Sequence, residues 1–368
     1  MRNPFKPSAG ARPPLLVGRQ DALEQFREGL EDGPGAPGLL TIFTGARGVG
    51  KTVMLTEAED AARAAGWVVV SDTVTPGLID RLTRAVRVRL NELGDGPPSR
   101  RVTGVTAGGF GVTTQLPPAQ PDDLRTVATE LTTILNTHET GLVITVDEIH
   151  AIDRVELATL AAVIQHLIRE ELPISLLAAG IPKAVSDLLN ENVSTFLRRA
   201  DRIDLRDVLI FEVEAAFAAT FADTRVAVTD AQVSAMADAT DGYPFLIQLV
   251  GYHVWRRAVE GNLTDAAVAV GIDAARRRLG STVLQASLAD LSQVDRTFLL
   301  KMSLDDGPSK LVDMAERLGE STRYVGVYRR RLIDAGIIVD AGRGLMNFAV
   351  PQLREYLREH AASGREII

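Results

Sequence analysis

The sequence predicts an α/β fold in which a parallel sheet lies between helices, followed by two smaller C-terminal units. Three observations support this prediction. Short apolar runs alternate with helical patterns, as in parallel sheets that are covered on both faces. A glycine-rich turn follows the first run, and paired carboxylates end the third. After residue 210 the pattern becomes almost entirely helical. The predicted strands are residues 39–43, 67–70, 142–148, 174–179 and 202–205.

The composition limits the class of protein. The chain has 368 residues, which suggests two or three units. It has no cysteine, so disulfides, zinc–cysteine sites and thiol catalysis are excluded. No apolar run is long enough to span a bilayer, and we expect a cytoplasmic protein without membrane contact. The net charge of −8 argues against a uniformly basic surface, but it allows nucleic-acid binding through one local patch.

The glycine-rich turn fits a phosphate-binding loop. It matches G-x-x-x-x-G-K-[ST] at every position, between a β-prone run and a helical pattern over residues 51–65. Glycines let backbone N–H groups curl around an anion, and the helix N-terminus adds partial positive charge. These flanking elements disfavour the alternative, a glycine-rich turn before a surface helix. The residues predicted to bind nucleotide here are Gly45, Ala46, Arg47, Gly48, Val49, Gly50, Lys51, Thr52 and Val53.

The loop and the paired carboxylates together predict an ATPase that uses ATP and Mg²⁺. Lys51 is expected to reach the β- and γ-phosphates, and Thr52 to place its hydroxyl on Mg²⁺. Asp147 would bind Mg²⁺ directly or through water, and Glu148 would polarise the attacking water. An Asp-Glu pair after a strand is also common near helix N-caps, but the loop favours the catalytic interpretation. His150 is either a ligand or relay, or a structural hydrogen-bonding residue.

With both motifs placed, residues 15–289 resemble an AAA+ ATPase of the group near the origin-recognition initiators and the STAND signalling ATPases. Residues 16–23 resemble the VGR-E-x-L entry motif of this group, whose backbone lies against the adenine. The resemblance implies that Val17, Gly18 and Arg19 contact the base.

Two further segments bear on the resemblance. Residues 240–248 resemble the GxP lid motif, in which Pro244 would contact the base. The fourth predicted strand ends in Gly180-Ile181-Pro182, whereas many AAA+ enzymes have a polar sensor residue there. This departure implies slow hydrolysis, and a switch is as compatible with it as a motor.

An arginine cluster precedes the last predicted strand. In AAA+ proteins an arginine finger often lies there and reaches the γ-phosphate of the neighbouring subunit. The resemblance implies this role for Arg199, with Arg198 as the second candidate, and hence a homo-oligomer. The alternative is a solvated arginine cluster at a helix end.

The patterns and the resemblance divide the chain into an N-terminal arm, a core, a lid and a C-terminal domain. The arm is Pro-rich and expected to be flexible, and the core carries an inserted β-hairpin. At the hairpin tip, Phe110 either inserts into a partner or packs back on its own domain, and we favour packing back. The boundaries are 1–14 for the arm, 15–210 for the AAA+ core, 100–118 for the hairpin, 211–290 for the helical lid and 291–368 for the C-terminal domain.

The C-terminal domain has the order of a winged helix. Two helical patterns precede a third that Ser321 caps and that runs to about residue 334, and two β-prone runs then flank a tight turn. This order resembles the winged-helix domains of initiator-like ATPases. A helix in the major groove and an arginine on the wing would suit duplex DNA. The candidate DNA contacts are Arg323, Arg329, Arg330, Arg331 and Arg343.

Two functions remain open from the sequence. The first is a nucleotide-switched DNA-binding ATPase with an initiator-like role in replication, mobile-element maintenance or regulation. The second is a STAND-like regulatory switch, in which the winged helix binds a protein partner or locks the chain internally.

Overall fold

The computed structural model describes residues 2–8, 10–93, 101–105, 112–115, 123–190, 196–289 and 291–362. In the inserted segment, β3 (Arg101–Val105) and β4 (Val112–Gln115) pair antiparallel, which agrees with the expected hairpin. Phe110 lies outside the described residues.

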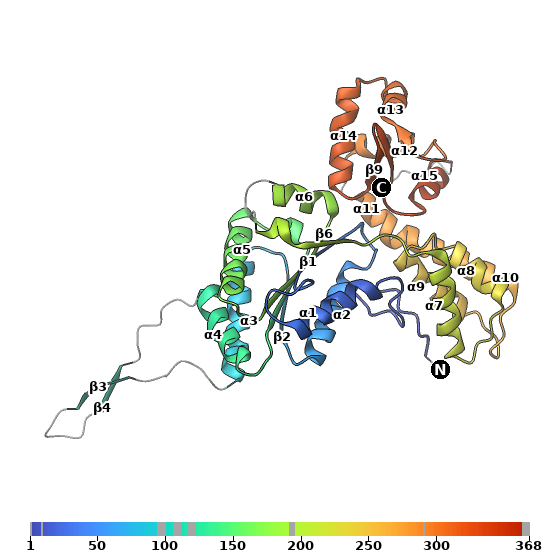
Figure 1. The fold of residues 1–368 in the computed structure, drawn as a ribbon. Coiled ribbons are helices and arrows are strands. Elements are labelled where there is room, and N and C mark those ends of the chain that lie inside the picture. Colours follow the sequence, from blue (N-terminus) through green and yellow to red (C-terminus); the bar gives the residue numbers. More distant parts are fainter. Residues whose placement is uncertain are drawn as a thin grey trace.

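The central sheet has five parallel strands in the order β2-β5-β6-β1-β7, which confirms the predicted α/β fold (Figure 1). Parallel neighbours need crossover connections, and helices supply them. The register aligns the carboxyl ends of four strands in two pairs: Thr44 is opposite Gly180, and Thr73 is opposite Asp147. The strands are β1 (Leu40–Thr44), β2 (Val68–Thr73), β5 (Leu142–Asp147), β6 (Ile174–Gly180) and β7 (Asp201–Asp204).

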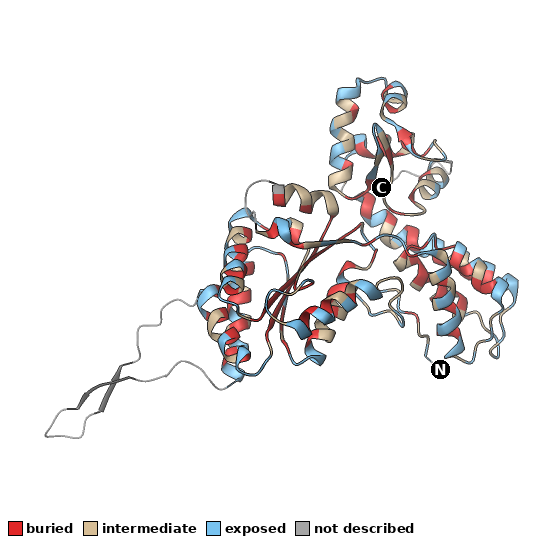
Figure 2. Ribbon diagram, viewed as in Figure 1, coloured by how far each residue is buried: buried red, intermediate tan, exposed pale blue. Residues whose placement is uncertain are grey.

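Helices cover both faces of the sheet, and alternate strand residues enter two separate cores (Figure 2). Val143 joins the core under α1 and α2, whereas Ile144 joins the core under α3, α4 and α5. Both are fully buried. The helices are α1 (Gln20–Asp32), α2 (Lys51–Ala64), α3 (Leu78–Glu92), α4 (Leu124–Asn136), α5 (Arg154–Arg169) and α6 (Pro182–Asn190), with the short turns η1 (Ile149–Ala151) and η2 (Leu197–Arg199).

The lid contains α7 (Ile210–Ala222), α8 (Asp230–Asp238), α9 (Pro244–Trp255) and α10 (Asp265–Leu279). Side-chain caps start two of them: Thr229 accepts from the backbone N–H of Gln232, and Thr264 accepts from that of Ala267. The lid lies beside the core in Figure 1.

The N-terminal arm, expected to be loose, is packed on the lid over its first residues. Phe5 is 3% exposed, and its ring lies 5.9 Å from that of Phe217 and 5.5 Å from that of Phe221. Gly251 of α9 makes room for it, since a Cβ there would lie 2.3 Å from the Phe5 ring. The expectation of a loose arm is wrong for this part, because Phe5 fills a lid core formed by residues more than 200 positions away.

A helical connection leads from the lid to the C-terminal domain. After α10 come a π-helical segment η3 (Gly280–Leu284) and α11 (Gln285–Ala289). The domain then contains α12 (Gln293–Met302), β8 (Ser309–Lys310), α13 (Leu311–Leu318), α14 (Thr322–Asp334), β9 (Ile338–Gly342), β10 (Leu345–Phe348) and α15 (Leu353–Ala362). The strands form a small antiparallel sheet in the order β8-β10-β9.

The C-terminal domain contacts both the lid and the core. The Gln352 side chain donates a 2.7 Å hydrogen bond to Asp241 of the lid. Tyr356 packs on Gly280 at the π-helical segment. On the core side, α14 lies against α6, and Gly336 faces the side chain of Ile181 just after β6.

Candidate nucleotide-binding site

The phosphate-binding loop joins the end of β1 to the start of α2, as predicted. Gly48 and Gly50 have φ of 79° and 96°, values that residues with a side chain rarely adopt. Gly45 has no room for a Cβ, which would lie 2.6 Å from the carbonyl oxygen of Leu205. Val49 is buried and anchors the loop, whereas Arg47 is exposed. The backbone therefore has the curvature that a phosphate requires, at the positive end of a helix.

Lys51 is buried at the bottom of this loop, with 7% exposure. Its Nζ donates to the carbonyl oxygens of Gly45 at 3.0 Å and Ala46 at 2.9 Å. Burial lowers the pKa of Lys51, and the carboxylates of Glu148 and Asp147 oppose that effect. A buried ammonium next to an anion-binding loop would bind phosphate oxygens strongly.

The predicted magnesium ligands meet at the carboxyl edge of the sheet. The Thr52 hydroxyl donates a 2.6 Å hydrogen bond to Oδ2 of Asp147. Oδ1 of Asp147 accepts the backbone N–H of Glu148 at 2.8 Å, which fixes the carboxylate. The described residues contain no cluster of three or more metal-ligating His, Cys, Asp or Glu side chains. One hydroxyl and one carboxylate fit Mg²⁺, which protein sites commonly share with substrate phosphates.

Glu148 sits in a left-handed backbone conformation, with φ of 56°, at the turn that leads into η1. Such a conformation is uncommon for a residue with a side chain and is often found at functional sites. Its side chain is 47% exposed, and Oε2 lies 3.3 Å from Nδ1 of His150. Burial lowers the pKa of His150, although Glu148 opposes the effect. The carboxylate thus lies next to Asp147 with access to water.

The entry segment lies against the hinge between core and lid. A Cβ on Gly18 would lie 2.8 Å from the carboxylate of Glu212 and 3.3 Å from Val208. Arg19 donates to the carbonyl of Arg206, and burial lowers its pKa. The adjacent Val17 is half-buried. The entry segment therefore lies at the junction where a base between core and lid would be contacted.

Tyr243 links the lid to the phosphate-binding loop, and sequence reasoning did not assign it a role. Its hydroxyl donates a 2.8 Å hydrogen bond to the carbonyl of Arg47, and the residue is fully buried. Burial raises its pKa well above the ordinary value. A Cβ at Gly48 would clash with this hydroxyl, at 1.8 Å. Pro244 follows as the first residue of α9 and is half-buried.

The two arginines before β7 differ in their contacts within the chain. Arg199 and Arg198 are both exposed at the end of η2. Arg198 has an interaction within the chain, whereas the Arg199 side chain has no hydrogen bond or ion pair among the described residues. The structure thus leaves the guanidinium of Arg199 at the surface.

The five candidate DNA contacts also fall into two groups. Arg329 pairs with Asp340 at 2.8 Å, and Arg331 pairs with the almost fully buried Asp295. These two arginines therefore fasten α14 to β9 and α12. By contrast, Arg323, Arg330 and Arg343 are exposed and form no ion pair within the described residues, whereas Arg331 stays half-exposed although it is paired.

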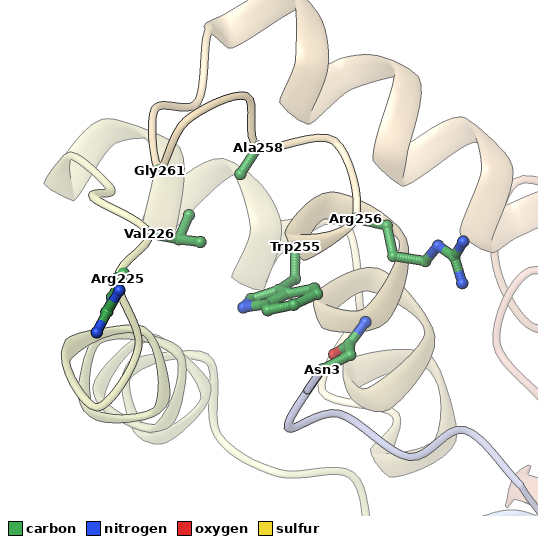
Figure 3. Close-up of a pocket in the computed structure, with 7 residues that line it drawn as sticks. All are labelled: Asn3, Arg225, Val226, Trp255, Arg256, Ala258 and Gly261. Atoms are coloured by element: carbon green, nitrogen blue, oxygen red, sulfur yellow. The ribbon is translucent and has the colours of Figure 1, made fainter. Parts of the chain in front are cut away.

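A cavity of about 450 Å³ lies in the lid, where the N-terminal arm meets α9 (Figure 3). It is lined by Asn3, Trp255, Arg225 and Arg256, among others, and by no residue of the phosphate-binding loop. The indole N–H of Trp255 is buried and has no hydrogen-bond partner in the described part of the chain.

None of the described helices is long and apolar enough to cross a membrane.

Comparison with known proteins agrees with this geometry. Residues 15–177 match the family described as the AAA ATPase domain, and residues 281–357 match a domain of unknown function (DUF8462). No curated protein matches the sequence.

Solved structures resemble the chain over nearly its whole length. A Walker-type ATPase of Pyrococcus abyssi has a TM-score of 0.68 at 13% identity, covering 93% of this chain and 96% of that one. The ORC2 protein of Aeropyrum pernix, in ADPNP–ADP complexes, has a TM-score of 0.61 at 16% identity, covering 97% of each chain. Residues 15–177 thus match an AAA ATPase domain, and the chain has an α/β fold with a five-stranded parallel sheet that it shares with structures of this kind.

Proposed function

We propose that this chain binds and slowly hydrolyses ATP, and that the bound nucleotide controls how its C-terminal domain binds duplex DNA. The observation that carries the ATPase proposal is the meeting of Thr52 and Asp147, at 2.6 Å, beside buried Lys51 and half-exposed Glu148. The ORC2 protein of A. pernix, which has a similar fold, is described in ADPNP–ADP complexes, which supports nucleotide binding by this chain.

Each residue of the site has a separate role in this proposal. The loop N–H groups and Lys51 bind the β- and γ-phosphates, while Thr52 and Asp147 hold Mg²⁺. When bound, Mg²⁺ neutralises negative charge on the phosphates. Glu148 accepts a proton from the attacking water, and its exposure gives that water access. Val17, Gly18, Arg19 and Pro244 would contact the base.

The lid would respond to nucleotide through Tyr243. Its hydroxyl bonds the carbonyl of Arg47, so a change in the loop on phosphate binding would reach α9 directly. The segment between β7 and α7 is bonded next to Tyr243, because the Val208 N–H donates a 2.8 Å hydrogen bond to the carbonyl of Gly242. This arrangement supports closure of lid on core as the conformational response to nucleotide.

The C-terminal domain would bind DNA as a winged helix. Arg323, Val327 and Arg330 follow an i, i+4, i+7 spacing, which places them on one face of α14. Val327 is 63% exposed, and both arginines are exposed. Arg343 lies in the turn between β9 and β10, at the tip of the wing. Arginine beside a small apolar side chain suits major-groove contacts to base edges and to the thymine methyl group.

A STAND-like regulatory switch is the second candidate. The observation that favours it is the docking of the C-terminal domain on both the lid, through Gln352 and Asp241, and the core, through Gly336 and Ile181. In this function the domain locks the chain internally, or binds a protein partner, and hydrolysis resets the lock.

DNA binding by the full chain distinguishes the two candidates. The Arg323→Ala/Arg330→Ala/Arg343→Ala variant should bind duplex DNA less tightly, and the slope of log K against log salt should fall by up to about three. The matched control is Arg276→Ala/Arg277→Ala/Arg278→Ala in α10, which removes the same charge. Equal losses of DNA affinity in the two triple variants would mean that positive charge attracts DNA nonspecifically. No DNA binding at low salt would favour the regulatory switch.

A further inference from the structure

One ring nitrogen of His150 faces two partners from different strands. His150 lies in η1, two residues after Glu148, where the carboxyl ends of β5 and β6 meet. Its Nδ1 is 3.3 Å from Oε2 of Glu148 and 3.4 Å from the backbone N of Ile181, the first residue after β6. The imidazole is 18% exposed, so solvent competes little for these contacts.

Nδ1 can form a hydrogen bond with only one of these partners at a time. With a hydrogen on Nδ1, it donates to the Glu148 carboxylate. With a lone pair there, it accepts the N–H of Ile181. Burial lowers the pKa of His150, and Lys51 and Arg47 add to this effect while Glu148 and Asp147 oppose it. A neutral ring has one hydrogen, so its tautomer determines which partner is bound.

The space for the ring comes from a glycine at the end of β6. A Cβ on Gly180 would lie 3.2 Å from Nδ1 of His150, 3.1 Å from Ile149 and 2.6 Å from Val185. The sequence shows no polar side chain at this end of β6. The structure places the imidazole of His150 there, from the neighbouring strand.

Ile181 connects this arrangement to the C-terminal domain. Its side chain is 6% exposed, and Gly336 faces it: a Cβ on Gly336 would lie 3.5 Å from Cγ2 of Ile181. Gly336 follows α14, which lies against α6, the helix that begins one residue after Ile181. A shift of the Ile181 backbone would therefore move the surface on which α14 sits.

We propose that His150 is a positioning residue that couples the Glu148 carboxylate to the seating of the C-terminal domain on the core. The inference rests on the proposed function, in which Glu148 activates water. A γ-phosphate adds negative charge beside Glu148 and favours hydrogen on the nitrogen that faces these oxygens. Nδ1 then orients Glu148, and the Ile181 N–H loses its acceptor. Without the γ-phosphate, Nδ1 accepts from Ile181 and the C-terminal domain is seated.

The test compares the full chain with three variants. His150→Asn places an amide at the position of Nδ1, His150→Gln places it near that of Nε2, and His150→Ala has neither. The measurements are kcat and KM for ATP, and amide exchange of residues 181–190 and 332–338 with and without ADPNP. We expect the Ala variant to bind ADPNP within about three-fold of the parent, and its kcat to fall about ten- to a hundred-fold.

The Ala variant should also lose the response of these residues to ADPNP. His150→Asn should restore both properties, and His150→Gln neither. As a matched control, His166→Ala in α5 should leave both unchanged. Parental kcat in His150→Ala, a persisting exchange response, or equal behaviour of the Asn and Gln variants would overturn the proposal. If the proposed function is wrong, the parent itself will not hydrolyse ATP. The response of amide exchange to ADPNP would still show whether His150 couples the nucleotide site to the C-terminal domain.

Discussion

In the candidate nucleotide site, one lysine and two carboxylates lie close together. Lys51 contributes one buried positive charge beside the carboxylates of Asp147 and Glu148, and burial and these carboxylates shift its pKa in opposite directions. In the proposed reaction the three residues have different roles, so substitutions at each should change kcat and KM in different ways.

Glu148→Gln keeps the size of the side chain and removes the proton acceptor. We expect this variant to bind ATP with nearly parental affinity and to hydrolyse it at least about a hundred-fold more slowly, in the range found for lost general bases. Equilibrium binding of ADPNP and steady-state turnover measure the two properties. Hydrolysis at the parental rate would show that this carboxylate does not activate the water.

Sequence spacing predicted the loop and the two carboxylates, because their chemistry needs fixed residue types next to a strand. It did not predict which of several arginines form ion pairs within the chain. Arg329 and Arg331 look identical to Arg330 in sequence, but their partners Asp340 and Asp295 come from other elements. The position of His150 was equally hard to predict, since its second partner is the backbone N–H of Ile181, the first residue after β6.

At the scale of elements, apolar periodicity and caps located most strands and helices closely. The predicted cap Ser321 accepts the N–H of Tyr324 at 3.2 Å, and α14 ends at Asp334, as expected. The arm was mispredicted because its proline content suggests a loose chain, whereas Phe5 fills a lid core. Asn3 and Lys6 also donate hydrogen bonds to α9. Arg12 adds exposed ion pairs to Glu57 and Asp60 of α2, which contribute little by themselves.

Phe5→Ala tests the docking of the arm. Truncation of a buried phenylalanine costs about 3–5 kcal/mol when the site cannot relax, but the arm can detach, which limits the loss to its docking free energy. We expect amide exchange of residues 2–8 to quicken at least about ten-fold, equivalent to about 1.4 kcal/mol. Lys6→Ala, an exposed side chain on the same segment, is the control. Unchanged exchange in Phe5→Ala would contradict docking through this ring.

In the whole molecule, two contacts bring the C-terminal domain close to the candidate nucleotide site. Gly336 meets Ile181 after β6, and Gln352 bonds Asp241, two residues before the loop-contacting Tyr243. Sequence analysis predicted the separate parts but not these contacts, because each joins residues more than a hundred positions apart. The contacts provide a physical route by which nucleotide could alter the C-terminal domain.

Assembly can be tested through Arg199, which is exposed before β7. If it acts on the γ-phosphate of a neighbouring subunit, turnover per chain should rise with protein concentration. Arg199→Ala should remove that rise, with a loss of up to about a thousand-fold, as for arginine fingers elsewhere. Arg202→Ala, an exposed neighbour on β7, should not. Turnover that is independent of concentration in the parent would exclude a finger acting between subunits.

The loop around Lys51 is proposed to bind ATP for hydrolysis. The most direct test is the steady-state ATP turnover of the full chain, measured beside Lys51→Ala. We predict slow turnover by the parent, below about 10 per second, the median for enzymes. Lys51→Ala should show no turnover above background, because the phosphates lose their buried cation. Equal turnover by the two chains would contradict the account.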